Sequence, residues 1–307
     1  MAARRLLTLL CALMIGLPGY AISSESPAPT IRQHNNPQLQ KLLEKHIKDL
    51  HLSSAVRSKR LSVALVDVTD PDMPSMAQVN GDEMMYAASL PKIAILLAAF
   101  ERIEEGKLQL NNETRQTMTN MIRYSSNQAA TQMIRAVGQD YINETLSSPK
   151  YRLYDKRYNG GLWVGKEYAG GTAFHRDPLH NLSHGATALQ VARFYYMLET
   201  GRLVSPESSR EMKNILGNPG INHKFVKGLS NTDAKIFRKS GSWRSFHADS
   251  ALIEHNGRSY IAVALANDPQ GGEWMKKLIR EMDNIILAQN PTTHIAKAET
   301  GRFQAAN

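Results

Sequence analysis

The spacing of hydrophobic positions predicts a helix and then strands at the start of the folded chain. Apolar residues recur every three or four positions from Pro37 to His51, the period of an amphipathic helix. Residues 61–68 alternate instead and are rich in β-branched side chains, which predicts a strand, and a short strand is expected near 77–80. The folded part therefore begins with a helix that precedes a sheet.

The middle of the chain is predicted to be mostly helical. Ser89 is placed as the N-cap of a helix with Pro91 in its first turn, and residues 93–100 are apolar on every side, so this helix should be buried. Further helices are expected over residues 112–124, 126–137, 187–200 and 205–216. Residues 147–184 carry many glycines and little periodicity, which predicts a long irregular and functional loop region.

Three strands and a last helix complete the pattern. The strands are expected over 235–240, 250–255 and 259–266, and the helix over 274–288. Strands at both ends of the chain with helices between them predict an antiparallel sheet that is completed late, beside a helical lobe. We expect the functional site where the sheet and this lobe meet.

The first 21 residues have the pattern of an export signal. Arg4 and Arg5 precede an apolar stretch that ends at Leu17 and is too short to span a bilayer, and Ala21 suits the cleavage position. The only cysteine, Cys11, lies inside this segment, so the mature protein is expected to have no thiol and no disulfide. We expect a protein exported to a bacterial periplasm or to the cell exterior, with a linker over 22–36.

Composition excludes some classes of protein. The chain of 307 residues is 42% hydrophobic and 21% charged, which is enough apolar material for a packed core. Its 37 basic residues exceed its 28 acidic ones, for a net charge of +9, but they are scattered, and nucleic-acid binding is not expected. We expect a monomer without a transmembrane segment in the mature chain.

Three short motifs occur in order: S-x-x-K at Ser89–Lys92, S-x-N at Ser125–Asn127 and K-[ST]-G at Lys239–Gly241. This order resembles the penicillin-recognising active-site serine family, which comprises class A β-lactamases and D,D-peptidases. A second S-x-x-K, Ser147–Lys150, lies in the predicted loop region with no apolar helix behind it, so we discount it. The resemblance covers about 37–288.

The first motif has the chemistry of an activated nucleophile. Residues three apart on a helix share a face, so Lys92 can reach the hydroxyl of Ser89 and remove its proton if burial and a second cation, Lys239, lower the pKa of its amine. The free N–H of Ser89 at a helix start can form half of an oxyanion hole. The resemblance implies that the other half comes from Ser242.

The other two motifs imply substrate contacts. By resemblance, Ser125 passes a proton to the leaving nitrogen and Asn127 holds the substrate amide. Lys239 and Ser240 are expected to bind a substrate carboxylate, and Gly241 to let the substrate backbone approach the strand. Arg244 and His247 follow closely along the chain and are candidates for the same carboxylate site, with a plain surface position as the alternative.

The chain departs from the class A pattern where the glutamate that deacylates the enzyme is expected. Glu167 lies in the right stretch between two glycines, but Gly171 occupies the place of the expected asparagine. We take Glu167 as the candidate base for hydrolysis of the acyl-enzyme, with a solvent-facing side chain as the alternative, and Asp177 as a weaker candidate.

These observations predict an α+β fold with a five-stranded antiparallel sheet flanked by helices and an all-helical lobe. The catalytic domain is expected over 37–288, with the helical lobe at about 85–200, the sheet lobe from 37–84 and 201–288, and a polar tail at 289–307. The predicted function is a serine hydrolase that cleaves an amide next to a carboxylate without cofactor or metal. Its substrate is expected to be a β-lactam, as in class A β-lactamases. The alternatives are a D-alanyl-D-alanine peptidase acting on a cell-wall peptide and a non-catalytic wall-binding module.

Overall fold

The computed structural model describes residues 31–289, and every structural statement below concerns these residues. The predicted signal peptide with Cys11, most of the linker and nearly all of the polar tail lie outside them. Among the described residues, no helix has the length and apolar character needed to cross a bilayer.

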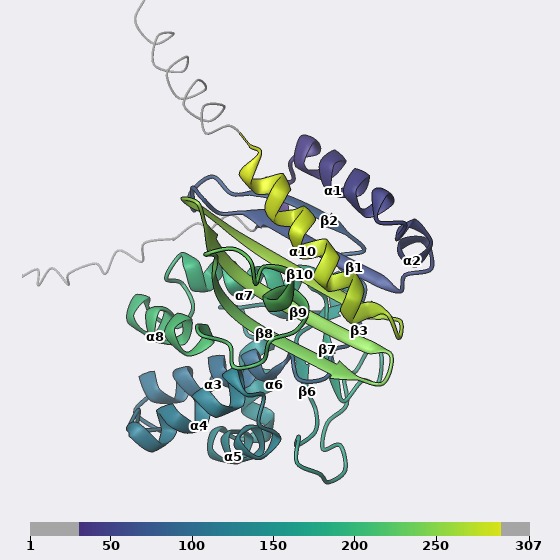
Figure 1. The fold of residues 1–307 in the computed structure, drawn as a ribbon. Helices are drawn as coiled ribbons and strands as arrows, with labels where there is room; N and C mark the ends of the chain where they lie inside the picture. Colours follow the sequence, from purple (N-terminus) through teal and green to yellow (C-terminus); the bar gives the residue numbers. More distant parts are fainter. Residues whose placement is uncertain (1–30, 290–307) are drawn as a thin grey trace, which may run out of the picture.

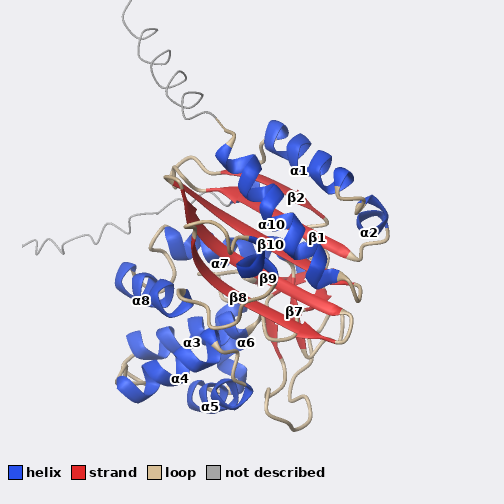
Figure 2. Ribbon diagram, in the orientation of Figure 1, coloured by secondary structure: helices blue, strands red, loops and turns tan. Residues whose placement is uncertain are grey.

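A five-stranded antiparallel sheet forms the centre of the structure, as the sequence predicts (Figures 1 and 2). Its strands are β1 (Leu61–Asp67), β2 (Ser75–Val79), β8 (Lys235–Trp243), β9 (Phe246–His255) and β10 (Arg258–Asn267). The order is β2-β1-β10-β9-β8, so the last three strands of the chain pair as a meander and β8 is an edge. The register pairs Lys239 with Ser250 and thereby fixes the third motif on this edge strand.

Alternation along the strands divides the core into two layers. On β10, Ile261, Val263 and Leu265 join the core that includes the helical lobe, whereas Tyr260 and Ala262 face the opposite core. Successive side chains of a strand point to opposite faces, so one central strand contributes to both cores.

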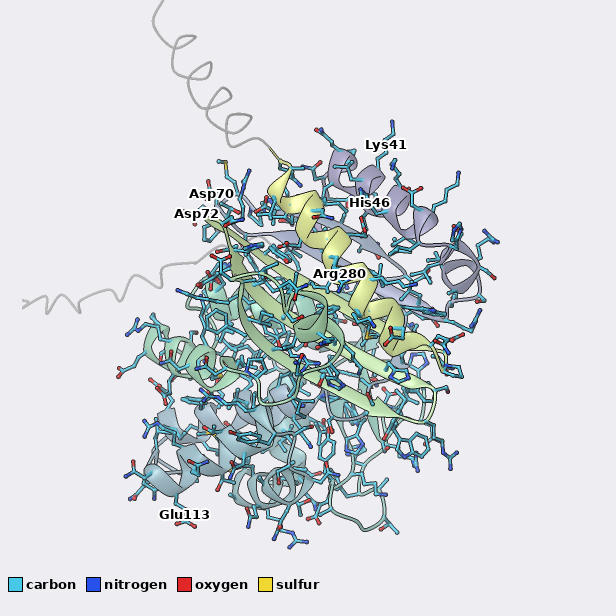
Figure 3. The ribbon with its side chains drawn as sticks, viewed as in Figure 1. Lys41, His46, Asp70, Asp72, Glu113 and Arg280 are labelled. Carbon is cyan, nitrogen blue, oxygen red and sulfur yellow. The ribbon has the colours of Figure 1, made fainter. Side chains whose placement is uncertain are left out.

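Helices α1 (Pro37–Asp49) and α10 (Gly271–Leu287) cover the outer face of the sheet, together with the short α9 (Lys224–Gly228). Figure 3 labels His46 on α1 and Arg280 on α10 in this outer layer. An ion pair of 2.6 Å between His46 Nδ1 and Glu281 Oε2 joins the two helices. The short α2 (Ser53–Arg57) leads from α1 into β1.

The remaining helices form the layer on the other face. They are α3 (Lys92–Glu104), α4 (Asn112–Arg123), α5 (Asn127–Val137), α6 (Gln139–Ser147), α7 (Ala188–Glu199) and α8 (Pro206–Leu216). The apolar run 93–100 of α3 is buried throughout, as its pattern predicts. The pattern analysis did not predict α6, because Gly138 at its start reads as a helix stop rather than as a junction between two helices.

The glycine-rich region between α6 and α7 contains short paired strands rather than unbroken loop. They are β4 (Tyr154–Asp155), β5 (Gly160–Gly161), β6 (Trp163–Val164) and β7 (His184–Ala186), with the one-turn helix η2 (Lys156–Tyr158). Strand β7 pairs with both β6 and β3 (Met85–Tyr86), which lies just before Ser89. Another one-turn helix, η1 (Ile31–His34), precedes α1.

Candidate active site

Ser89 lies in a turn between β3 and α3 and not at the N-cap of the helix, which corrects the sequence prediction. The helix begins at Lys92, and its cap residue is Pro91, which makes no side-chain capping bond. Ala88, just before the serine, has a φ of 49°, a left-handed conformation that is uncommon for a residue with a Cβ. The turn therefore leaves the Ser89 hydroxyl free of the capping role that we assigned to it.

Two buried amines meet at the hydroxyl of Ser125. Lys239 Nζ donates to Ser125 Oγ at 2.9 Å, and Lys92 Nζ lies 3.5 Å from the same atom. Lys92 also donates to the carbonyl of Ser125 at 2.7 Å and to Asn127 Oδ1 at 2.8 Å. Ser125 adopts a φ of 57° in the turn between α4 and α5, which directs both its polar groups toward the lysines.

Burial gives both amines unusual acidity. Lys92 is 0% exposed, and burial lowers its pKa to about 7. Lys239 is 1% exposed, and burial together with the nearby charge of Lys92 lowers its pKa well below the ordinary value. An amine with a pKa near 7 is present in both protonation states at neutral pH, which suits a general base.

The K-S-G segment of β8 packs directly against the turn that contains Ser89. A Cβ added to Gly241 would lie 2.3 Å from the carbonyl oxygen of Ala87 and 2.7 Å from the backbone nitrogen of Ser89. A larger residue would push the strand away from the serine. Glycine is thus required here for a close approach of two backbones.

Sequence analysis missed two side chains beside this strand. His223 Nε2 lies 3.2 Å from Ser240 Oγ, and burial lowers the pKa of this histidine to about 4, so it is neutral at pH 7. The buried Lys224 donates to the carbonyls of Gly241 and Ala248 and to Ser242 Oγ, at 2.5, 3.0 and 2.8 Å. Three acceptors satisfy all three donors of an ammonium group, so this lysine holds β8 and β9 together in its charged form.

A buried ion pair supports the cationic strand from behind. Both nitrogens of the Arg238 fork donate to Asp249, at 2.7 and 2.8 Å, and both side chains are almost fully buried. Asp249 also accepts the backbone N–H of Phe225. No sequence motif indicated this pair. Arg238 directly precedes the K-S-G motif, and Asp249 lies opposite Ser240 on the paired strand.

Glu167 pairs with an arginine on α5 instead of lying beside Ser89, where the predicted base would act. Its carboxylate forms two bonds of 2.8 Å with Arg135 on α5, and that pairing lowers the pKa of the carboxyl. Among the described residues, Glu167 makes no hydrogen bond to Ser89 or Lys92, so its position does not fit the predicted base. Asp177, the weaker candidate, is buried and accepts the Tyr154 hydroxyl and the His180 N–H instead.

The neighbour of Glu167, Tyr168, reaches the site in its place. The Tyr168 hydroxyl donates to the carbonyl of Ala88 at 3.1 Å, and the centre of its ring lies 4.5 Å from Lys92 Nζ. On its other side the ring packs on His184 at 4.1 Å. The only sequence feature that could have indicated this tyrosine is its position next to Glu167 in a loop flanked by glycines.

Arg244 and His247, the two further candidates for binding a substrate carboxylate, lie at the hairpin between β8 and β9. Arg244 is exposed, and its guanidinium stacks on Trp243 at 4.2 Å. His247 is half-buried, with Nδ1 3.5 Å from Ser242 Oγ. The structure therefore brings His247, through Ser242, next to the K-S-G segment, whereas Arg244 is engaged at the hairpin tip.

The second S-x-x-K motif lacks the arrangement of the first. Ser147 ends α6, and Lys150 pairs with Glu101 at 2.7 Å on the surface. In the part of the chain that the structure describes, no three His, Cys, Asp or Glu residues gather in a way that could hold a metal ion.

Comparison with known proteins assigns the chain to a family. A profile described as "Beta-lactamase enzyme family" matches residues 41–115 and 112–289. No curated protein was found to match the chain by sequence.

Solved structures share the fold at low sequence identity. A β-lactamase from Sphaerobacter thermophilus DSM 20745 superposes with a TM-score of 0.61 at 19% identity, over 78% of this chain and 98% of its own. A point mutant of PBP-A, solved as an acyl-enzyme complex with penicillin G, gives 0.62 at 19%, over 85% and 100%. A class A β-lactamase representative from Bacteroides cellulosilyticus DSM 14838 gives 0.61 at 17%, over 82% and 98%.

The profile match extends over most of the chain, and the fold agrees with structures of the same superfamily. The chain therefore belongs to the β-lactamase enzyme family and is a serine hydrolase that acts on amide bonds.

Proposed function

We propose that the protein hydrolyses β-lactams slowly, through an acyl-enzyme on Ser89. The observation that carries this proposal is the pair of buried amines, Lys92 and Lys239, that share the Ser125 hydroxyl at 3.5 and 2.9 Å. One of them follows the nucleophile by three residues, and the other belongs to the strand that lies against the nucleophile.

Acylation uses these groups in turn. Neutral Lys92 takes the proton of Ser89 Oγ, and the oxygen attacks the carbonyl carbon of the lactam. The backbone N–H groups of Ser89 and Ser242 stabilise the oxyanion. When the C–N bond breaks, the nitrogen receives the Ser125 proton, which the neighbouring lysine ammonium replaces. Asn127 is proposed to hold the substrate amide.

Substrate binding is proposed to depend on the carboxylate next to the scissile amide. Lys239 offers a charge and Ser240 a hydroxyl, which neutral His223 orients from 3.2 Å. His247 is proposed to add to this site through Ser242, from which its ring nitrogen lies 3.5 Å away. Arg244 would have to leave Trp243 to do the same.

Hydrolysis of the acyl-enzyme is proposed to be the slow step. It requires a base that aligns and deprotonates a water molecule. The Glu167 carboxylate is held by Arg135, and an aromatic ring lies beside Lys92. We therefore expect the acyl-enzyme to accumulate, as a burst of product followed by a slow phase.

The aromatic ring beside Lys92 also favours a second candidate, a D-alanyl-D-alanine peptidase. A peptidase needs no base that releases a bound penicillin, and Tyr168 lies where such a base would have to contact Lys92. The third possibility is a wall-binding module without catalysis. The lowered pKa values of the two buried lysines favour a catalyst over such a module.

A fluorescent penicillin, followed over time, separates the three candidates. Label that appears and then decays supports the β-lactamase, stable label supports the peptidase, and no label supports the binding module. Ser89→Ala should abolish labelling, whereas the matched variant Ser147→Ala at the second S-x-x-K should retain it. Peptide mapping that finds the label anywhere except Ser89 contradicts the proposed nucleophile.

We further propose that residues 1–21 direct export and are removed after Ala21. Amino-terminal sequencing of the protein recovered from the periplasm or the medium tests this. A start at Ile22 agrees with the proposal, and retention in the cytoplasm with Met1 contradicts it. Light scattering of the purified protein tests the expected monomer.

A further inference from the structure

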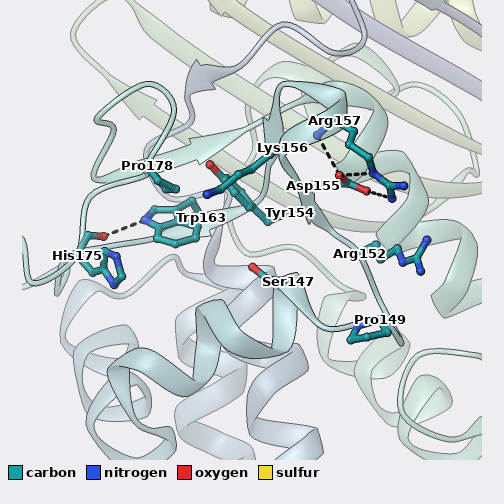
Figure 4. A pocket seen from close by; sticks show the side chains of 10 residues that line it. All are labelled: Ser147, Pro149, Arg152, Tyr154, Asp155, Lys156, Arg157, Trp163, His175 and Pro178. Atoms are coloured by element: carbon teal, nitrogen blue, oxygen red, sulfur yellow. Dashed lines mark hydrogen bonds and ion pairs between the residues drawn. The ribbon is translucent and has the colours of Figure 1, made fainter.

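A cavity of about 690 Å³ lies outside the active site, between α6 and the short strands that follow it (Figure 4). Its volume is in the range of sites that hold small ligands. None of the three motifs contributes to its lining, although Ser147 of the discounted motif does.

The wall of this cavity carries an excess of positive charge. Arg152, Lys156 and Arg157 line it, and Asp155 is the only acidic lining residue. Both oxygens of Asp155 are bound by Arg157, at 3.1 and 2.6 Å. Among the described residues, Arg152 and Lys156 have no ion-pair partner, so two cations face the cavity uncompensated.

The backbone that carries Arg152 is held by a half-buried guanidinium. Arg193 donates to the carbonyls of Tyr151 and Arg152, at 3.1 and 2.6 Å. Arg152 itself has a φ of 46°, in the left-handed region where arginine rarely lies. The fold thus fixes the backbone of Arg152, while its exposed side chain extends from this point.

The floor of the cavity is formed by aromatic rings and has few free hydrogen-bonding groups. The rings of Tyr154 and Trp163 pack at 4.7 Å, and the edge of His175 meets Trp163 at 5.4 Å. The Trp163 indole N–H donates to the carbonyl of His175, and the Tyr154 hydroxyl donates to Asp177. The polar atoms of both rings are therefore engaged, which suits an apolar ligand group and leaves few partners for sugar hydroxyls.

The cavity lies close to the catalytic turn but does not belong to it. Trp163 and Tyr86 both pair with Gly185, from opposite sides of β7. Two strand spacings separate their backbones by about 10 Å. Side chains of Met84 and Leu182 approach Gly185, so a ligand in the cavity has no open path across this strand to Ser89.

We propose that this cavity binds short acidic peptides, whose carboxylates pair with Arg152 and Lys156 while an apolar side chain rests against Trp163. Opposite charge on the wall and the apolar surface of the floor give the selectivity. The proposal is independent of the reaction at Ser89.

Calorimetry with the intact protein tests the proposal, with acetyl-Glu-Leu-Glu-amide as the probe and its neutral glutamine analogue as control. We expect the acidic probe alone to bind, and Arg152→Gln and Lys156→Gln each to weaken binding about tenfold. Both side chains are exposed, so neither variant threatens folding. Lys48→Gln on α1 is the matched control and should change binding less than about twofold.

Three results would overturn the proposal. Equal binding of the neutral peptide removes the role of charge. Loss of binding in Lys239→Ala but not in Lys156→Gln moves the site to the catalytic cleft. Tighter binding of a trigalacturonate, with the same sensitivity to Arg152 and Lys156, assigns the cavity to acidic saccharides instead of peptides.

Discussion

Tyr168 offers the sharpest test of how the site controls its general base. Its hydroxyl contacts Ala88 and its ring contacts Lys92, so two substitutions separate the two contacts. Tyr168→Phe removes only the hydrogen bond to the Ala88 carbonyl, and Tyr168→Leu also removes the ring that faces Lys92.

The two contacts predict different effects. A hydrogen bond between uncharged groups contributes about 0.5–1.5 kcal/mol, so Tyr168→Phe should slow acylation by no more than roughly tenfold. A desolvated cation over an aromatic ring gains about 2 kcal/mol, and only the protonated amine makes this interaction. Loss of the ring should therefore make Lys92 easier to deprotonate and lower its pKa by about 1.5 units.

The assay is the acylation rate of a fluorescent penicillin measured from pH 5.5 to 9. Because Lys92 must be neutral to act as a base, the rate of the unmodified enzyme should rise with pH around the value of about 7. Tyr168→Phe should keep this midpoint, and Tyr168→Leu should shift it to lower pH. A shift to higher pH, or the same shift in both variants, refutes the cation–ring argument.

Three further predictions concern the neighbouring charges. Lys92→Ala should reduce acylation by roughly 10²-fold or more, whereas Lys239→Ala should mainly raise KM, with partial recovery in Lys239→Arg; indistinguishable kinetics would contradict these separate roles. Glu167→Gln should leave release of the hydrolysed product unchanged in a single-turnover assay, because Arg135 holds that carboxylate; slower release would restore it as the base. Asp249→Asn should lower the free energy of unfolding by about 3–5 kcal/mol, measured by denaturant titration, because it leaves Arg238 buried beside a neutral side chain; a loss below about 1 kcal/mol would show that the pair is not structural.

The sequence predicted those parts of the fold whose pattern is local. The runs of apolar and β-branched residues in β1 and β10 and the uniformly apolar α3 gave the right elements, since most of the residues in these segments are buried. The first two motifs lie at element boundaries, whereas Lys239–Gly241 lies inside β8, which continues to Trp243. The N-cap of α3 was predicted two residues early, at Ser89 instead of Pro91, because serine before proline has the same signature whether its hydroxyl caps a helix or stays free.

The rest of the site depends on contacts that local patterns do not encode. Lys224 and His223 lie in a stretch without periodicity and reach β8 only because α9 packs beside it. Tyr168 stands beside the acidic residue that the family pattern singles out, and only the three-dimensional path of its loop decides which of the two side chains turns inward.

Together these contacts give the site more positive charge than its one buried acid can balance. Lys239, Lys224 and Arg238 lie around Asp249, Lys92 adds its charge next to Lys239, and burial lowers the pKa of each of the three lysines. The difference between 10.5 and about 7 for Lys92 corresponds to roughly 5 kcal/mol that opposes folding with the amine charged. The unfolded chain binds more protons between these two pH values, so the contribution of Lys92 to stability increases as the pH rises from 7 to about 10. An anionic group bound at Lys239 acts in the opposite direction, because it stabilises the protonated amines. Burial of Lys92 thus makes the fold less stable at neutral pH, and it creates the features on which the proposed reaction depends, a lysine amine with a lowered pKa and a cationic strand beside Ser89.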